Sequence, residues 1–198
     1  MTLPNIIEAK RITLYALQKP SFDMSEKLFH EINSSRERLK EWLPWVDTIQ
    51  CAEDEYSRYL VELCQTRWNA GTGFAYAIFL RNAVQILGCI EIFNISWNDK
   101  SGEIGYWLSN TAEGYGYMTE AVNALDTTAF SAELESVVIK TDKKNLRSCH
   151  VAECCGYVLE EIIHNDTWDK FHQCFRDTAI WRKYSPTRRN SLHSLLAP

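Results

Sequence analysis

The chain has 198 residues, of which 45% are hydrophobic and 24% charged, with a formal net charge of −5. This length suits one domain with a sizeable core, and no apolar run approaches the ~18 residues that a membrane span needs. The acidic balance gives no reason to expect nucleic acid as a partner and favours a cationic one, such as an amine or a basic protein.

The cysteines and the N-terminus predict a cytoplasmic protein. There are seven cysteines, none forms a CxxC pair, and Cys154 and Cys155 are adjacent, which does not suit a framework of disulfides. We therefore expect reduced thiols. The N-terminus lacks the features of a secretory signal. A structural zinc site would need compact Cys/His spacing, which the histidines do not provide, so we predict no metal.

The first third of the chain predicts one strand and two helices. Residues 11–17 alternate polar and apolar and form a strand that Pro20 closes. Helical spacing begins at Phe22 and continues through a charged segment until Pro44 stops it. A helix over 52–68 has acidic residues in its first turn and one apolar stripe.

The central segment predicts a meander followed by a crossover. Residues 73–80, 84–93 and 101–109 are β-rich runs at hairpin spacing and predict three antiparallel strands. Helical spacing over 118–129 and a short strand over 135–140 follow. Strand, turn, helix and strand in this order predict a βαβ unit with two parallel strands side by side.

The last third predicts a capped helix and two strands. Asn145 caps a helix over 146–155 that Gly156 ends, and strands are expected over 157–163 and 174–181. We expect residues 185–198 to be a loosely ordered tail. The whole predicts a single α/β domain over 1–184, with a mixed, mostly antiparallel sheet of about six or seven strands and helices on both faces.

The stretch AEGYGYMTEA places two glycines directly before the central helix. A GxxxxGK[ST] phosphate loop is excluded because the lysine and hydroxyl are missing. A dinucleotide fingerprint lacks its third glycine, which is Thr119 here. A strand-to-helix turn without a ligand is a further interpretation. The free N–H groups of a helix start, together with glycines that permit close approach, favour a bound phosphate.

This stretch resembles the Q/R-x-x-G-x-G/A motif that binds the pyrophosphate of acetyl-CoA in the GNAT superfamily of N-acetyltransferases. Glu113 stands for the usual Gln or Arg and Met118 for the final small residue. About residues 8–182 resemble the ribosomal-protein N-terminal acetyltransferases. The resemblance rests on EIGYWL, the GxG turn and N-x-x-S-x-x-V-x-x-x-x-G-Y, which occur in this order, and on WLPW upstream of them. The resemblance implies the GNAT fold, acetyl-CoA as co-substrate and a primary amine as acceptor, possible acceptors including a ribosomal protein N-terminus.

The resemblance also implies which residues hold the cofactor. The strand edge expected to bind pantetheine consists of Trp107, Leu108 and Ser109. The pyrophosphate turn consists of Glu113, Gly114, Tyr115, Gly116, Tyr117, Met118 and Thr119. Asn145 is expected to bind the pantetheine amide or to cap its helix, and Ser148 to donate to the leaving sulfur or to contact the cofactor.

Amide formation by an amine is helped by a general base. Glu103 is the first candidate, because it lies on the strand that leads into the site and resembles the glutamate of the histone-acetylating branch. It would otherwise be an exposed strand residue without a chemical role. Asp166 and Glu161, near the expected acceptor pocket, are the alternatives.

Other chemically distinctive residues are assigned to structure. Trp42, Trp45 and Trp68 are expected in the core or as acceptor-pocket walls, and His164, His172 and Cys154 are expected to be structural. No cysteine lies in a motif for covalent catalysis, so direct transfer in a ternary complex is predicted for a monomer or homodimer. Two rival functions are acetylation of a small amine, polyamine or antibiotic, and a non-catalytic module that only binds CoA.

Overall fold

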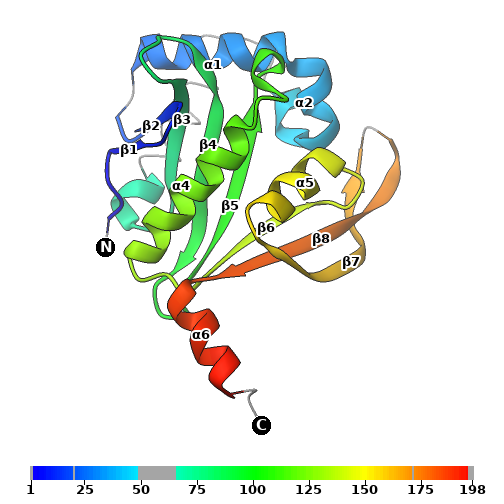
Figure 1. Cartoon of the computed structure of the whole chain (residues 1–198). Coiled ribbons are helices and arrows are strands. Elements are labelled where there is room, and N and C mark those ends of the chain that lie inside the picture. Colours follow the sequence, from blue (N-terminus) through cyan, green and yellow to red (C-terminus); the bar gives the residue numbers. More distant parts are fainter. Residues whose placement is uncertain (1, 20, 49–65, 171, 196–198) are drawn as a thin grey trace.

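A computed structural model describes residues 2–19, 21–48, 66–170 and 172–195 (Figure 1). An eight-stranded sheet in the order β1-β2-β3-β4-β5-β6-β8-β7 runs through the molecule. Its strands are β1 (Ile6–Glu8), β2 (Ile12–Ala16), β3 (Phe74–Leu80), β4 (Ile86–Ser96), β5 (Ser101–Leu108), β6 (Ser136–Asp142), β7 (Val158–Asp169) and β8 (Cys174–Tyr184).

The sheet confirms the mixed, mostly antiparallel topology but has one strand more than the six or seven predicted. The additional strand is β1, which pairs with β2 over only three residues. A three-residue run is too short for alternation to register as a strand. All neighbouring strands are antiparallel except β5 and β6, which are parallel as the βαβ pattern predicted.

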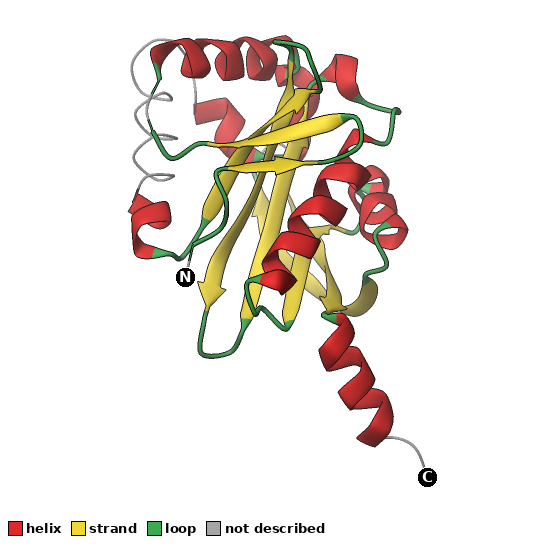
Figure 2. Cartoon of the chain, turned by 60° about the vertical axis from the view of Figure 1, so that its left-hand side comes forward, coloured by secondary structure: helices red, strands yellow, loops and turns green. Residues whose placement is uncertain are grey.

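Helices cover both faces of the sheet (Figures 1 and 2). They are α1 (Phe22–Ser34), α2 (Arg36–Trp42), α4 (Tyr117–Ser131), α5 (Leu146–Cys154) and α6 (Pro186–Leu195), with short 3₁₀ turns η1 (Pro44–Thr48) and η2 (Asn110–Ala112). The helix predicted over 52–68 lies largely outside the described residues; residues 66–68 of it are helical.

The alternation of side chains along the strands divides the core in two. On one face, the buried residues Tyr76, Ile78, Ile90 and Ile92 belong to the same cluster as Ala121, Val122 and Leu125 of α4. On the other face, Ala77, Cys89 and Trp107 cluster with Leu28 and Ile32 of α1 and Leu39 of α2. Since successive strand residues point to opposite faces, each helix layer covers its own set of strand positions.

Two helical predictions needed correction. The helix expected from Phe22 to Pro44 is interrupted at Ser35, whose hydroxyl accepts a hydrogen bond from the Asn110 N–H at 2.9 Å. This contact couples the interruption to η2, far away in sequence. The tail expected to be loosely ordered forms α6, because Pro186 follows Ser185, whose hydroxyl accepts from the Arg188 N–H and caps the helix. The domain boundary at residue 184 stays a prediction.

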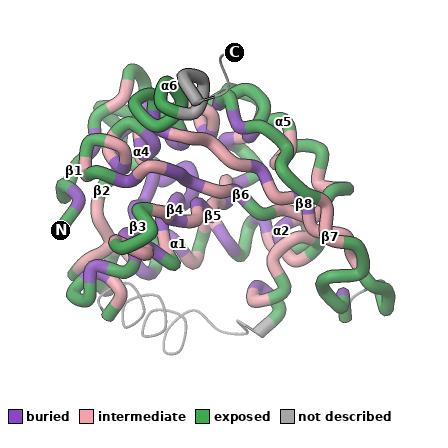
Figure 3. Tube along the Cα trace, turned by 90° about the horizontal axis from the view of Figure 1, so that it is seen from below, coloured by how far each residue is buried: buried purple, intermediate pink, exposed green. Residues whose placement is uncertain are grey.

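The centre of the sheet and its edge strand β7 differ in burial (Figure 3). The central strands are buried, whereas most residues of the edge strand β7 are exposed. None of the helices among the described residues is both long and apolar enough to cross a lipid bilayer.

Candidate active site

A cavity opens where the two parallel strands separate. Pairing between β5 and β6 covers only Ser101↔Ser136 to Ile104↔Ile139, after which β5 stays beside β4 and β6 stays beside β8. Because each strand follows its own antiparallel neighbour, a gap forms between them. The cavity of about 340 Å³ in this gap is lined by segments 41–44, 104–106, 139–142 and 166–169, and by Asn145, Ser148, Arg176 and Thr178.

The glycine turn leads directly into α4. Gly114 has φ of 80° and Gly116 has φ of 76°, both in the left-handed region that glycine adopts without strain. Gly116 is the N-cap of α4 and supplies no side chain, so no side chain caps the first N–H groups. A Cβ added at Gly114 would meet no atom within 4 Å. The turn therefore has open space at Gly114 beside a helix start without a side-chain cap, which fits an anionic group such as a diphosphate.

The two departures from the motif have local explanations. Met118 is only 4% exposed and packs in the core under α4, so its larger side chain points away from the turn. Glu113 forms ion pairs with Arg38, at 2.5 Å, and with Arg147. The acidic residue thus holds two arginines beside the turn.

Arg38 and Arg11 connect the turn to other parts of the domain by hydrogen bonds and ion pairs. Arg38 donates to the Leu108 carbonyl at 2.6 Å. The pKa of Arg38 is lowered, because the effect of burial outweighs the opposite effect of the Glu113 carboxylate. Arg11 donates to the Tyr115 carbonyl at 2.8 Å and forms an ion pair with Glu120 of α4 at 2.7 Å. Three arginines from distant parts of the chain therefore lie around the glycine turn, and no local sequence pattern marks them.

The strand edge expected to hold pantetheine is partly occupied by the protein itself. The Leu108 carbonyl accepts from Arg38, and the Ser109 N–H donates to the Leu87 carbonyl at 2.8 Å. The Trp107 side chain is 8% exposed and packs in the core beneath α1 and α2. The part of β5 that lines the cavity is Ile104 to Tyr106 instead.

The start of α5 brings Asn145 and Ser148 into the cavity wall. The Asn145 side chain caps the helix by accepting the Ser148 N–H at 3.2 Å. The phenol oxygen of Tyr106 lies 2.9 Å from the Ser148 hydroxyl and 3.3 Å from the Ser148 carbonyl, so its single hydrogen can be donated to either oxygen. Burial raises the pKa of Tyr106. Sequence reasoning missed Tyr106, although its place within EIGYWL, on the strand that ends at the turn, marks it as a residue near the site.

The three carboxylate candidates lie in different places. Glu103 forms an ion pair with Lys140 at 3.0 Å and is not among the residues that line the cavity. Glu161 is exposed on β7 and does not line it either. Asp166 does line the cavity, and its carboxylate accepts hydrogen bonds from the hydroxyls of Thr178, at 2.6 Å, and Thr167, at 3.4 Å. Asp166 is therefore the candidate with direct access to an acceptor.

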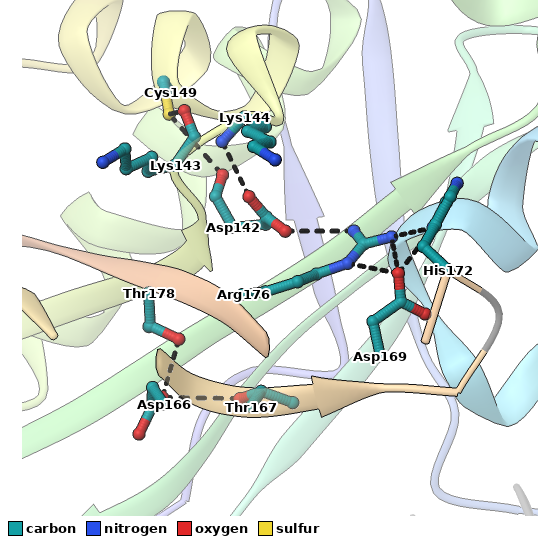
Figure 4. A network of polar contacts seen from close by, with 10 residues as sticks. All are labelled: Asp142, Lys143, Lys144, Cys149, Asp166, Thr167, Asp169, His172, Arg176 and Thr178. Atoms are coloured by element: carbon teal, nitrogen blue, oxygen red, sulfur yellow. Dashed lines mark hydrogen bonds and ion pairs between the residues drawn. The ribbon is translucent and has the colours of Figure 1, made fainter. Parts of the chain in front are cut away.

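Two further acids of the cavity, Asp142 and Asp169, are engaged by Arg176 (Figure 4). Its guanidinium donates to Asp142 at 3.0 Å and to Asp169 at 2.6 Å, and it lies over the ring of Trp42, 5.2 Å from the centroid. Although burial acts to lower it, the pKa of Arg176 is raised by its hydrogen bonds to these two carboxylates. Arg176 therefore joins β6, β7 and the end of α2 around the cavity.

The candidate tryptophans and histidines lie at separate places in the molecule. Trp42 lines the cavity, whereas Trp45 packs against the core under α1 and Trp68 stacks edge-on against Phe74 in the main core. His172 contacts Asp169 at 2.5 Å and His164 contacts Asp177 at 2.9 Å. Cys154 is exposed on α5, with its sulfur 3.4 Å from the Nε2 of His150. Their structural role stays a prediction.

Fold and site together define an α/β protein with a glycine turn and an uncapped helix start at the open end of two splayed parallel strands. Comparison with known proteins identifies the family. The acetyltransferase (GNAT) domain matches residues 11–158, and the chain belongs to this family of acetyltransferases, which use acetyl-CoA as co-substrate.

Several proteins that are similar to the chain are also named acetyltransferases. The chain is 30% identical over 148 residues to the ribosomal-protein-serine acetyltransferase of Escherichia coli (strain K12), covering 72% of this chain and 80% of the relative. The structure of the ribosomal L7/L12 alpha-N-protein acetyltransferase RimL in complex with coenzyme A is similar, with a TM-score of 0.81 at 22% identity over 90% of this chain and 97% of that one. The microcin C7 self-immunity acetyltransferase MccE in complex with acetyl-CoA and AMP gives a TM-score of 0.78 at 24% identity over 89% and 93%.

Proposed function

We propose that the chain transfers an acetyl group to the N-terminal α-amino group of a ribosomal or other protein, by direct attack in a ternary complex. The observation that carries the proposal is the carboxylate of Asp166 in the wall of the cavity that also holds Ser148. Among the described residues its hydrogen-bond partners are two threonine hydroxyls, and no cation neutralises it. The relative from Escherichia coli, whose name specifies a ribosomal protein, supports the acceptor class.

In the proposed reaction acetyl-CoA supplies the acetyl group as a thioester. A carbon–nitrogen bond forms as the carbon–sulfur bond breaks. Asp166 accepts the proton of the acceptor amine, directly or through one water, since only a neutral nitrogen can attack. Ser148 donates a hydrogen bond to the departing sulfur and so stabilises its negative charge. The turn at Gly114 and Gly116 holds the diphosphate through backbone N–H groups.

The charge of the cavity also favours a cationic acceptor. Four of its charged side chains are acidic and two are basic: Glu41, Asp142, Asp166 and Asp169 against Lys140 and Arg176. Arg176 engages Asp142 and Asp169, which leaves Asp166 and Glu41 to attract an ammonium group. The same charge would suit a polyamine or another small amine, which is therefore the second candidate. We further propose that the enzyme acts in the cytoplasm, where the cysteines would stay reduced.

The acceptor can be identified by mass spectrometry after incubation with acetyl-CoA. Ribosomal proteins, peptides with free or blocked N-termini, and spermidine should be offered separately. Acetylation of free N-termini and not of the blocked peptides is the expected result. Modification of spermidine alone would establish the second candidate, and binding of CoA without modification of any acceptor would establish a non-catalytic module.

Replacing Tyr106 with phenylalanine is expected to lower kcat roughly two- to tenfold, the worth of one hydrogen bond, with little change in the Kd of CoA. The phenol can donate to the Ser148 hydroxyl and leave the hydroxyl hydrogen free to face the sulfur. Steady-state kinetics with calorimetry would measure both quantities. Tyr157→Phe is the matched control, because it also removes a buried phenol, one that donates to Asp126 away from the cavity. Equal kcat values for Tyr106→Phe and the wild type would show that Tyr106 does not support Ser148.

Replacing Arg147 with glutamine is expected to raise the Kd of CoA roughly two- to tenfold and to leave the Kd of pantetheine unchanged. The Arg147 side chain is 74% exposed, and its ion pair with Glu113 holds it beside the glycine turn. Its charge can therefore reach a phosphate bound there. Calorimetry with both ligands would measure the difference. Arg189→Gln, an exposed arginine of α6, is the control. The expectation fails if pantetheine binding is weakened as much as CoA binding.

A further inference from the structure

The edge strand β7 contains a bulge whose last residue is Asp166. Ile163 pairs with Thr178 and Thr167 pairs with Arg176, so residues 164–166 lie opposite the single residue Asp177. Asn165, in the middle of the bulge, has φ of 53°, a left-handed conformation that asparagine tolerates better than most residues. Because side chains alternate along a strand, such an insertion changes the direction in which the following residue points. The bulge therefore decides whether Asp166 faces the cavity.

The carboxylate of Asp177 contacts two residues of this bulge, Asn165 and His164. One of its oxygens accepts the Asn165 N–H at 3.0 Å. The other lies 2.9 Å from the Nδ1 of His164 and 2.8 Å from the Nζ of Lys143. The contacts with Lys143, the Asn165 N–H and His164, in this order, hold the pKa of Asp177 well below its usual range. The side chain thus stays ionised and bound to the bulge at neutral pH.

Asp177 also connects the bulge with the opposite wall of the cavity. Its carbonyl accepts the Lys143 N–H at 3.0 Å, and Lys143 lies two residues before Asn145, the cap of α5. The next residue of β8, Thr178, donates to Asp166 at 2.6 Å, as Figure 4 shows. The acceptor side and the leaving-group side of the cavity are therefore both anchored at one position of β8.

We propose that Asp177 is a positioning residue, which fixes the β7 bulge so that the Asp166 carboxylate points into the cavity. This inference rests on the proposed function, in which Asp166 accepts the proton of the amine. Asp177 itself is not among the residues that line the cavity. Its effect on the reaction should therefore pass through Asp166.

The decisive experiment combines Asp177→Ala with Asp166→Asn and measures kcat/KM for the amine acceptor and the Kd of CoA. Asp177→Ala is expected to lower kcat/KM about 10- to 100-fold, since displacement of a reacting group by about 1 Å has effects of this size. The Kd of CoA should stay within about twofold, because the backbone contact that precedes α5 remains. In the Asp166→Asn background, Asp177→Ala should cause no further loss.

Three further variants separate the bulge from general stability. Asp177→Asn keeps an oxygen for the Asn165 N–H and should restore most of the activity. Lys143→Met removes the ion pair with Asp177 but keeps the hydrogen bond from the Asn165 N–H to Asp177. Its kcat/KM should stay within about threefold of the wild type. Asn165→Ala disfavours the left-handed conformation and should reproduce the loss if Asp177→Ala does not fold, which melting temperatures would reveal.

Two results would overturn the inference while leaving the proposed function intact. One is an Asp177→Ala enzyme with normal kcat/KM while Asp166→Asn is impaired. The other is a loss from Asp177→Ala that persists in full in the Asp166→Asn background, since it would then act independently of Asp166. An unimpaired Asp166→Asn enzyme would overturn the inference together with the role of Asp166, and a wild-type protein that acetylates no amine would overturn the function itself.

Discussion

Replacing Asp166 with asparagine is expected to lower kcat about 10²- to 10⁴-fold, the usual contribution of a general base. Asparagine has nearly the same shape and can still accept the Thr178 hydroxyl, but it cannot take a proton from the amine. Steady-state acetylation of an N-terminal peptide, at saturating acetyl-CoA, would measure the effect. The Kd of CoA should be unchanged, because Asp166 lies on the acceptor side of the cavity.

Glu103→Gln is the matched control for this experiment. Both variants convert a carboxylate to an amide near the splayed strands, but Glu103 is engaged by Lys140 at 3.0 Å and does not line the cavity. We expect its kcat to stay within a few-fold of the wild type. The opposite ranking, with Glu103→Gln inactive and Asp166→Asn active, would return the role of base to Glu103, the first candidate from the sequence.

Replacing Lys183 with methionine is expected to lower the free energy of unfolding by about 3–5 kcal/mol at pH 8, because it leaves a buried carboxylate without its cation. Lys183 contacts Asp126 at 2.8 Å, and the Asp126 side chain is only 2% exposed. Tyr157 donates to the other carboxylate oxygen at 2.6 Å and cannot replace the lost charge. Urea denaturation monitored by tryptophan fluorescence would measure the change.

The loss should shrink as the pH falls. Burial raises the pKa of Asp126 above its ordinary value even with Lys183 in place, and the variant should raise it further. The native state then binds a proton more tightly than the unfolded state, so the free energy of unfolding falls as the pH rises through this range. Relative to the wild type, Lys183→Met should therefore be less destabilised at pH 5 than at pH 8.

Lys100→Met is the control for burial. Lys100 contacts Glu135 at 2.9 Å, nearly the same distance, but the two side chains are 48% and 38% exposed. Exposed ion pairs contribute little to stability, so this variant should unfold almost like the wild type and with no comparable pH dependence. Equal destabilisation by both variants would show that the burial of Asp126 is not the cause.

Much of the fold could be predicted because its signals are local. An apolar, β-rich run over 73–80 and helical spacing over 118–129 identify their elements without knowledge of the rest of the chain, and the order of elements implied the parallel pair. The errors arose where the local signal is weak or overruled. β1 is too short to show a pattern, and the interruption at Ser35 accompanies a contact with Asn110.

The candidate site was predictable to a lesser degree. The glycine turn and the Asn145 cap are backbone features, and each is encoded by the residues that form it. The arginines around Glu113, the Tyr106 beside Ser148 and the direction of Asp166 follow no local pattern. They depend on which side chains the sheet order brings together.

The sequence by itself determined the class of fold, the glycine turn before α4 and the cap that places Ser148, because these follow from backbone preferences over a few neighbouring residues. The tertiary structure decided which of the candidate carboxylates lines the cavity and which arginines lie around the turn. The physical reason is that side-chain charges act over a few ångströms of space, and partners such as Arg38 and Glu113 meet only after the strands and helices have packed.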